Sequence, residues 1–135
     1  MDYLLDTNTL SALIETNQSI VSRVDRIAPA EYVYSSVITE GELLFGLVNT
    51  PPSRRPPLAE RIKIGLAAMA QIIPLTSPVA DAYSNIRYHL KVTGQPLPDN
   101  DIWIAAVAMA NGYILVSHDA AFTHIPGLKL EDWLA

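Results

Sequence analysis

Short apolar runs alternate along this chain with longer segments in which apolar residues recur every three or four positions. The short runs predict β-strands at residues 3–5, 32–35, 72–75 and 113–116, with a weaker one at 128–130. The longer segments predict helices at residues 9–14, 39–48, 58–71, 78–93 and 102–111. Strands that alternate with helices are typical of an α/β fold, in which a mostly parallel sheet is covered by helices on both faces.

The proline-rich stretch NTPPSRRPP, residues 49–57, interrupts this pattern. We do not interpret it as a domain boundary, because the part before it would be too small to hold its own core. Residues 1–135 are therefore expected to form a single domain, with this stretch as a proline-stiffened loop between two helices. Its arginines, Arg54 and Arg55, are either solvated loop side chains or contacts for a phosphate backbone.

Composition favours a globular protein, because 50% of the 135 residues are hydrophobic and 17% are charged. The chain has no cysteine, which excludes disulfides, thiolate zinc sites and cysteine nucleophiles and is consistent with a reducing compartment. We find neither a signal-peptide pattern nor an apolar stretch long enough to cross a bilayer. We therefore expect a cytoplasmic protein that does not bind membranes.

The formal net charge is −5. An acidic chain is not expected to hold nucleic acid by overall electrostatic attraction. If its substrate is a polyanion, a divalent metal ion could neutralise both the substrate and the carboxylates of the protein.

Acidic residues gather where the predicted strands end. Ligands of open parallel sheets bind outside the carboxyl ends of the strands, so acids at these positions can converge although they are far apart in the sequence. Asp6 and Asp119 follow strands, and Glu40 and Glu42 lie in the first turns of the helix after the second strand. Asp99 and Asp101 immediately precede the helix at 102–111.

Each of these acids also has a purely structural interpretation. Asp6 and Asp119 could cap or turn the chain after a strand, and Thr39 with Glu42 forms a capping box. Residues 99–101 are good N-cap types before an apolar helix. Capping does not explain the acids as a group, however, because four carboxylates at one end of a sheet would repel one another and raise their pKa values unless a cation is present.

Carboxylate oxygens without cysteine or paired histidine favour Mg²⁺ or Mn²⁺ over zinc. The three histidines, His89, His118 and His124, do not have the spacing of metal ligands. Because Mg²⁺ usually takes only one or two carboxylates directly, four acids suit either two metal ions or one ion with further carboxylates around its waters. Such a site suits the hydrolysis of phosphodiester bonds.

Four motifs, in this order, resemble those of the PIN-domain ribonucleases, and in particular the VapC-type toxins of type II toxin–antitoxin systems. They are LLDTN at residues 4–8, ITEGELLFG at 38–46, PDNDIWIAAVA at 98–108 and LVSHDAAF at 115–122, and the closing IPGLKLEDW at 125–133 is also similar. The resemblance covers nearly the whole chain. It implies a three-layer α/β/α sandwich around a mostly parallel sheet.

The resemblance also implies roles for individual residues. The catalytic acids, which would hold the metal, correspond to Asp6, Glu42, Asp101 and Asp119, with Glu42 binding either directly or through water. Supporting polar positions correspond to Thr7, Asn8 and Ser117. Glu40 and Asp99 have the wrong spacing for the family pattern and are left out of the site.

By resemblance, the protein is expected to be an endoribonuclease dependent on Mg²⁺ or Mn²⁺, a homodimer, and the partner of a cognate antitoxin. The helix around residues 58–71 either packs in the core or offers a groove to the antitoxin or to a second copy. Two alternatives are a non-catalytic PIN-like module that binds RNA or protein, and a phosphotransferase with Asp6 as nucleophile. The latter is disfavoured because Asn8 stands where such enzymes carry a second aspartate.

Overall fold

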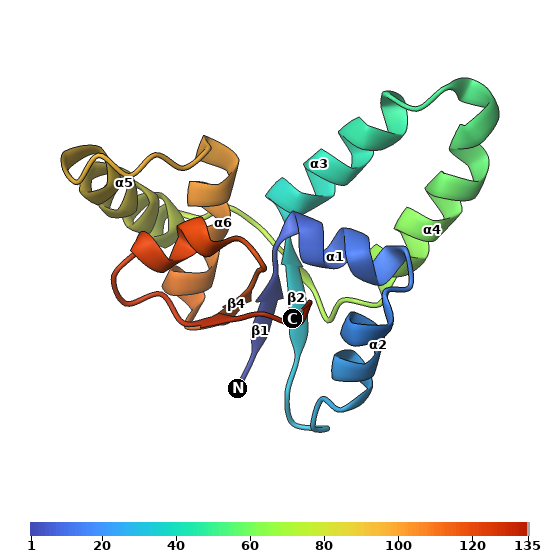
Figure 1. Ribbon diagram of the computed structural model, residues 1–135, viewed down its shortest axis with the longest axis horizontal. Helices are drawn as coiled ribbons and strands as arrows, with labels where there is room; N and C mark the ends of the chain where they lie inside the picture. Colours follow the sequence, from blue (N-terminus) through green and yellow to red (C-terminus); the bar gives the residue numbers. More distant parts are fainter. Residues whose placement is uncertain (135) are drawn as a thin grey trace.

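The computed structural model describes residues 1–134 and has a five-stranded, fully parallel sheet at its centre (Figure 1). The strand order across the sheet is β3-β2-β1-β4-β5. The strands are β1 Tyr3–Leu5, β2 Val33–Ser36, β3 Ile72–Ile73, β4 Ile114–Val116 and β5 Leu130–Glu131. All five were predicted from the sequence, with ends that differ by no more than two residues.

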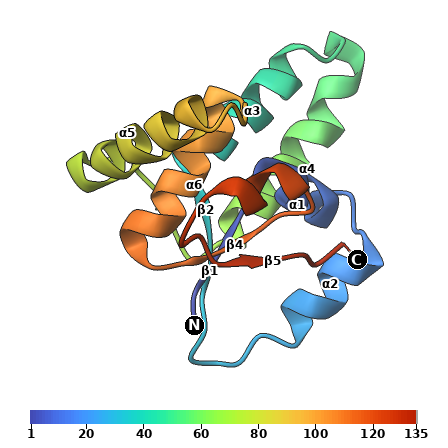
Figure 2. The same ribbon diagram turned by 60° about the vertical axis from the view of Figure 1, so that its left-hand side comes forward.

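Helices cover both faces of the sheet, which confirms the predicted α/β sandwich (Figures 1 and 2). One layer contains α1 Thr7–Ile14, α2 Gln18–Asp25, α3 Val37–Val48 and α4 Arg55–Ala67. The other contains α5 Ser77–Val92 and α6 Asp99–Asn111. Two short 3₁₀ helices, η1 Pro52–Arg54 and η2 Ala120–His124, lie in the connections.

The central strands bury both of their faces. Leu4 of β1 and Leu115 of β4 belong to the core beneath α5 and α6, whereas Leu5 and Val116 belong to the core beneath α1–α4. This alternation follows from the two-residue period of a strand, and it explains why the central strands are apolar throughout. On α6, residues 105, 106 and 108 are fully buried alanines, whose small side chains let the helix lie close to the sheet.

Helix α2 was not predicted. Ile20 is its one fully buried residue, and Val24 and Ile27 pack partly buried against the same core. This spacing fits a helix, but most of the eight residues of α2 are polar and no long apolar run draws attention to the segment. Asn17 begins the helix by accepting a hydrogen bond from the backbone N–H of Ile20 at 3.2 Å. Its place against the sheet depends on tertiary packing.

Asp6 is the N-cap of α1, as its structural interpretation predicted, whereas the caps expected for two other helices differ. Ser36, not Thr39, is the N-cap of α3, because the Ser36 side chain accepts a hydrogen bond from the backbone N–H of Thr39 at 3.2 Å. The capping box of Thr39 and Glu42 is therefore absent. Helix α6 starts at Asp99, so Asp99 and Asp101 lie inside its first turn and do not precede it.

The proline-rich stretch is also more ordered than the predicted loop. It contains η1, and its last residues form the first turn of α4, where prolines are well tolerated. Arg55 donates hydrogen bonds to the carbonyl oxygens of Val48 and Thr50, at 2.8 and 2.7 Å. Its guanidinium therefore closes the C-terminal end of α3, whereas Arg54 is exposed.

Candidate active site

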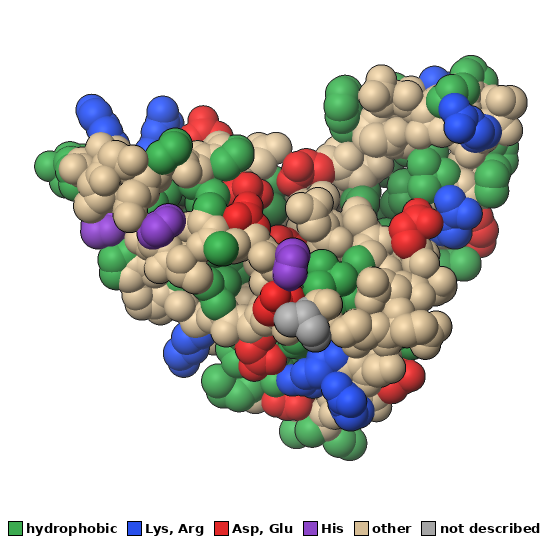
Figure 3. Space-filling model, in the orientation of Figure 1, with side chains coloured by type: hydrophobic (Ala, Val, Ile, Leu, Met, Phe, Trp, Pro, Cys, Tyr) green, Lys and Arg blue, Asp and Glu red, His purple; other side chains and the backbone are tan. Residues whose placement is uncertain are grey.

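An acidic cleft of about 440 Å³ opens where the strands β1 and β2 end. It lies in the notch between the arm formed by α3 and α4 and the arm formed by α5 and α6, where Asp and Glu side chains gather (Figure 3). Helix α6 runs back toward the start of β4, which brings its N-terminal turn to this end of the sheet. The lining residues are Asp6, Thr7, Asn8, Glu42, Pro98, Asp99, Asn100 and Asp101.

Asp6 is the most buried of these acids, with 5% of its surface exposed. Its backbone N–H donates to the carbonyl oxygen of Val116, and its side-chain Oδ1 accepts a hydrogen bond from the backbone N–H of Thr9 at 2.8 Å. The carboxylate thus caps α1, as the sequence predicted, and is fixed at the floor of the cleft. Because capping uses Oδ1 only, Asp6 can cap the helix and also face a ligand with its other oxygen.

Glu42 is held by Thr7. The Thr7 hydroxyl donates to Glu42 Oε1 at 2.8 Å and lies 3.0 Å from the hydroxyl of Thr39. Since Thr7 has one hydroxyl hydrogen, it accepts from Thr39 when it donates to Glu42. The role of Thr39 was missed by the sequence analysis, although its place one helical turn before Glu42 was a signal that the two share a face of α3.

Asp101 has the most strongly perturbed carboxyl group of the site. Its pKa is raised from an ordinary value of 3.8 to about 6, first by burial and then by the charges of Glu42, Asp119 and Asp6, in that order of importance. The four predicted acids therefore share one electrostatic environment, although they come from four different parts of the chain.

Asp119 lies beside the cleft and does not line it. Its carboxylate is exposed and its Oδ1 accepts a hydrogen bond from the backbone N–H of Ala121 at 2.9 Å, which starts η2. Ser117 is buried, and its hydroxyl accepts from the backbone N–H of Asp119 at 3.0 Å. Ser117 thus shapes the turn that presents Asp119, and its hydroxyl bonds to the backbone in the manner of a local turn.

Glu40 and Asp99, the two acids left out of the predicted site, lie in different places. Glu40 does not line the acidic cleft. Asp99 does, but its Oδ1 accepts a hydrogen bond from the hydroxyl of Tyr83 at 3.0 Å and lies 4.0 Å from a guanidinium nitrogen of Arg87. Asp99 is also absent from the charges that raise the pKa of Asp101. It therefore belongs to a second cluster at the edge of the cleft.

The donor set suits a hard divalent cation. Its oxygens are those that Mg²⁺ and Mn²⁺ prefer. A cation between the carboxylates would relieve the repulsion that adds to burial in raising the pKa of Asp101. Within residues 1–134, no three Asp, Glu or His side chains are already grouped as they would be around a bound ion.

The family model of the PIN domain matches residues 3–128. The chain therefore belongs to the PIN-domain family. It is 31% identical to "Ribonuclease VapC1" of Haemophilus influenzae (strain R2866) over 140 aligned positions that cover 98% of both proteins. It is 32% identical to "Toxin FitB" of Neisseria gonorrhoeae over 123 positions, which cover 86% of both proteins.

Solved structures show the same fold. A chain in the structure of VapBC2 from Rickettsia felis bound to a DNA fragment from their promoter superposes with a TM-score of 0.91 and 26% identity, over 98% of this chain and 99% of that one. VapBC-1 from nontypeable Haemophilus influenzae gives 0.88 and 26%, over all of both chains. No helix within residues 1–134 is long and apolar enough to span a membrane.

Proposed function

We propose that the protein is a metal-dependent endoribonuclease and the toxin of a toxin–antitoxin pair. The observation that carries this function is the convergence of Asp6, Glu42 and Asp101 in one cleft of a PIN domain, with Asp119 close enough to raise the pKa of Asp101. The names of the relatives, ribonucleases and a toxin, support the same activity.

The metal ion would be held by Asp6, Asp101 and Asp119, with Glu42 bound directly or through water. When bound, Mg²⁺ or Mn²⁺ would polarise the phosphate and make a water molecule more acidic. Asp6 is suited to hold the ion in place because it is buried and fixed by the N-terminus of α1. The hydrogen bond from Thr7 orients Glu42, and one of the carboxylates accepts the proton of the attacking water.

The proposed partners are the RNA substrate, a cognate antitoxin and a second copy of the chain. An antitoxin is supported by the related solved structures, which contain VapBC complexes. A protein partner is also consistent with the exposed apolar side chains of Phe45, Val48 and Ile64 on α3 and α4. Ile62 and Gly65 of α4 are buried, so only part of this helix is available for docking. We expect the enzyme to act on RNA in the cytoplasm.

Purified protein incubated with mixed single-stranded RNAs would test this function. Cleavage is expected with Mg²⁺ or Mn²⁺, should stop with EDTA, and should be lost in D6N, which keeps the volume of the side chain and removes its charge. Metal-dependent cleavage that persists unchanged in D6N would contradict the assignment. RNA that binds but is never cut would favour a non-catalytic binding module.

A further inference from the structure

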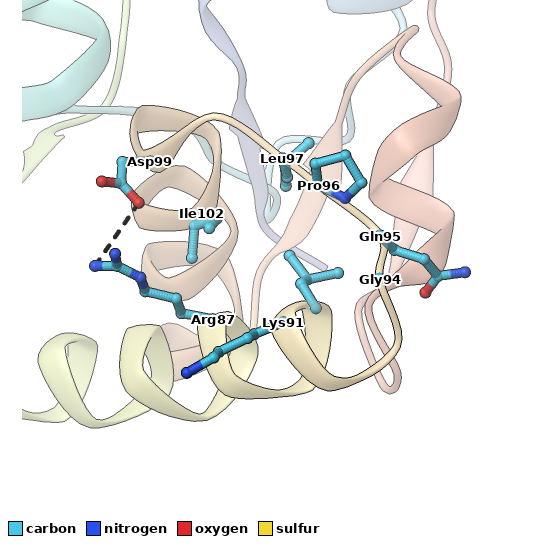
Figure 4. Close-up of a pocket in the computed structure, with 9 residues that line it drawn as sticks. Arg87, Lys91, Gly94, Gln95, Pro96, Leu97, Asp99 and Ile102 are labelled. Carbon is cyan, nitrogen blue, oxygen red and sulfur yellow. Dashed lines mark ion pairs between the residues drawn. The ribbon is translucent and has the colours of Figure 1, made fainter.

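A second groove adjoins the acidic cleft and differs from it in charge. This basic groove, of about 440 Å³, runs between α5 and the start of α6 and shares Asp99 with the acidic cleft (Figure 4). Its floor is apolar and contains Leu90, Leu97 and Ile102. Its rim carries Arg87 and Lys91, which lie one helical turn apart on the same side of α5.

These two cations are well placed for a polyanion. Among the described residues, no Lys or Arg side chain lines the acidic cleft itself, whereas Arg87 and Lys91 line the groove next to it. Both are exposed. The protein has a net charge of −5, and its cleft is lined by carboxylates. An RNA strand therefore needs a local positive region of this kind in order to approach the cleft.

Arg87 is also held in position. One of its guanidinium nitrogens donates to the hydroxyl oxygen of Tyr83 at 2.9 Å, and the same hydroxyl donates to Asp99 at 3.0 Å. The ring of Tyr83 stacks on Trp103, with centroids 3.8 Å apart and planes 12° apart. A guanidinium fixed in this way loses less conformational freedom when it binds a phosphate, and its planar fork matches phosphate geometry.

We propose that the basic groove binds single-stranded RNA beside the bond to be cut, which rests on the ribonuclease function proposed above. Arg87 and Lys91 contact backbone phosphates, and the apolar floor accommodates a ribose or base. Contacts of this kind set the register of the strand and carry little sequence information. Arg87 and Lys91 are thus positioning residues, and Asp99, together with Tyr83, holds Arg87 at the junction of the two clefts.

Salt-dependent RNA binding tests this assignment. The D6N protein with Mg²⁺ would be titrated with a short fluorescent single-stranded RNA. The titration would be repeated with R87Q and with K91Q, each introduced singly into the D6N protein. Each variant is expected to reduce the slope of log Kd against log salt by about 0.7, and so to weaken binding about fivefold at about 0.1 M salt. K129Q is the matched control, because Lys129 precedes β5 and therefore lies at the opposite end of the sheet.

The possible results distinguish RNA binding in the basic groove from the proposed ribonuclease activity of the acidic cleft. If R87Q and K91Q keep the slope of D6N, or if K129Q loses as much, the groove assignment is wrong even where the wild-type protein cuts RNA. Failure of D6N to bind RNA would also overturn it. If the slope falls as expected but the wild-type protein never cuts RNA, the groove stands and the ribonuclease function does not. R87K gives a further check, since it retains the charge and should keep most of the slope.

Discussion

The hydroxyl of Thr7, at the start of α1, donates a 2.8 Å hydrogen bond to Oε1 of Glu42 on α3. The two residues are 35 positions apart, and the bond joins two helices that both line the acidic cleft. The residue that follows the first acid of the site therefore orients the second acid.

Loss of the Thr7 hydroxyl should impair the site without changing any acid. Thr7→Val removes the donor to Glu42 and is expected to reduce metal affinity or cleavage rate at least about tenfold, the usual effect of losing a group that orients a metal ligand. Thr7→Ser retains the hydroxyl and should stay near the wild-type level. The measurements are kcat/KM and the Mg²⁺ concentration for half-maximal cleavage. Equal behaviour of the two variants would show that the hydrogen bond has no role.

The capping and metal-binding roles of Asp6 can be separated by two substitutions. Asparagine caps helices as well as aspartate does, so D6N should be at least as stable as the wild-type protein while losing cleavage. D6A loses both roles, and its free energy of unfolding should fall by about 1 kcal/mol relative to D6N. Urea denaturation measures the stability difference. A D6A protein as stable as D6N would mean that the bond to the backbone N–H of Thr9 contributes nothing.

The raised pKa of Asp101 predicts how stability depends on pH. Its folded-state pKa of about 6 lies above the ordinary 3.8, so the folded protein binds this proton more tightly than the unfolded chain. The stabilisation that comes from protonated Asp101 is therefore complete at pH values below 3.8 and is lost as the pH rises through about 6. Above both values, the ionised Asp101 therefore destabilises the fold.

The D101N variant, which cannot ionise, checks this dependence. It should be more stable than the wild-type protein at about pH 7.5, by about 1–2 kcal/mol after allowance for the partial exposure of the side chain. Most of the difference should disappear near pH 4, where the wild-type group is protonated in the folded state. Urea midpoints at both pH values measure it. A constant difference across this range would contradict the assignment of the raised pKa to Asp101.

Gly65 is needed for the close approach of α4 to α1. A Cβ atom at this position would lie 2.5 Å from Cγ1 of Ile14, so Gly65→Ala should destabilise the protein by about 1–3 kcal/mol. Gly46→Ala is the matched control on α3. A Cβ atom at that helical glycine would meet no atom within 4 Å, so the substitution should stabilise the protein by about 0.5–1 kcal/mol. Thermal unfolding compares the two.

A second-site change tests the cause of the Gly65 effect. Ile14→Ala removes the atoms that the new methyl group would meet, so the cost of Gly65→Ala should be much smaller in that background. Equal costs in both backgrounds would show that something other than contact with Ile14 is responsible.

The sequence was most informative where local pattern and burial agree. The runs at Tyr3–Leu5 and Ile114–Val116 are apolar because both faces of these strands are buried, so each was recognisable as a strand. Helix α2 was not predicted although Ile20 and Val24 have helical spacing, because the helix has only eight residues and most of them are polar. The start of α3 was misplaced because Ser36, the last residue of β2, also serves as its N-cap.

By itself, the sequence determined that Asp6 follows a strand of a parallel sheet and that Asp101 stands at the start of a helix that leads back to the next strand. The geometry of such sheets then brings both acids to the carboxyl ends of the strands. Only the tertiary structure decided how each acid is used. Thr7 orients Glu42, which is 35 residues away in the chain. The hydroxyl of Tyr83 bonds to Asp99, 16 residues away, and to Arg87, and so holds Asp99 apart from the other acids. These contacts depend on side chains that meet only when the helices pack against the sheet, so no local pattern in the chain contains them.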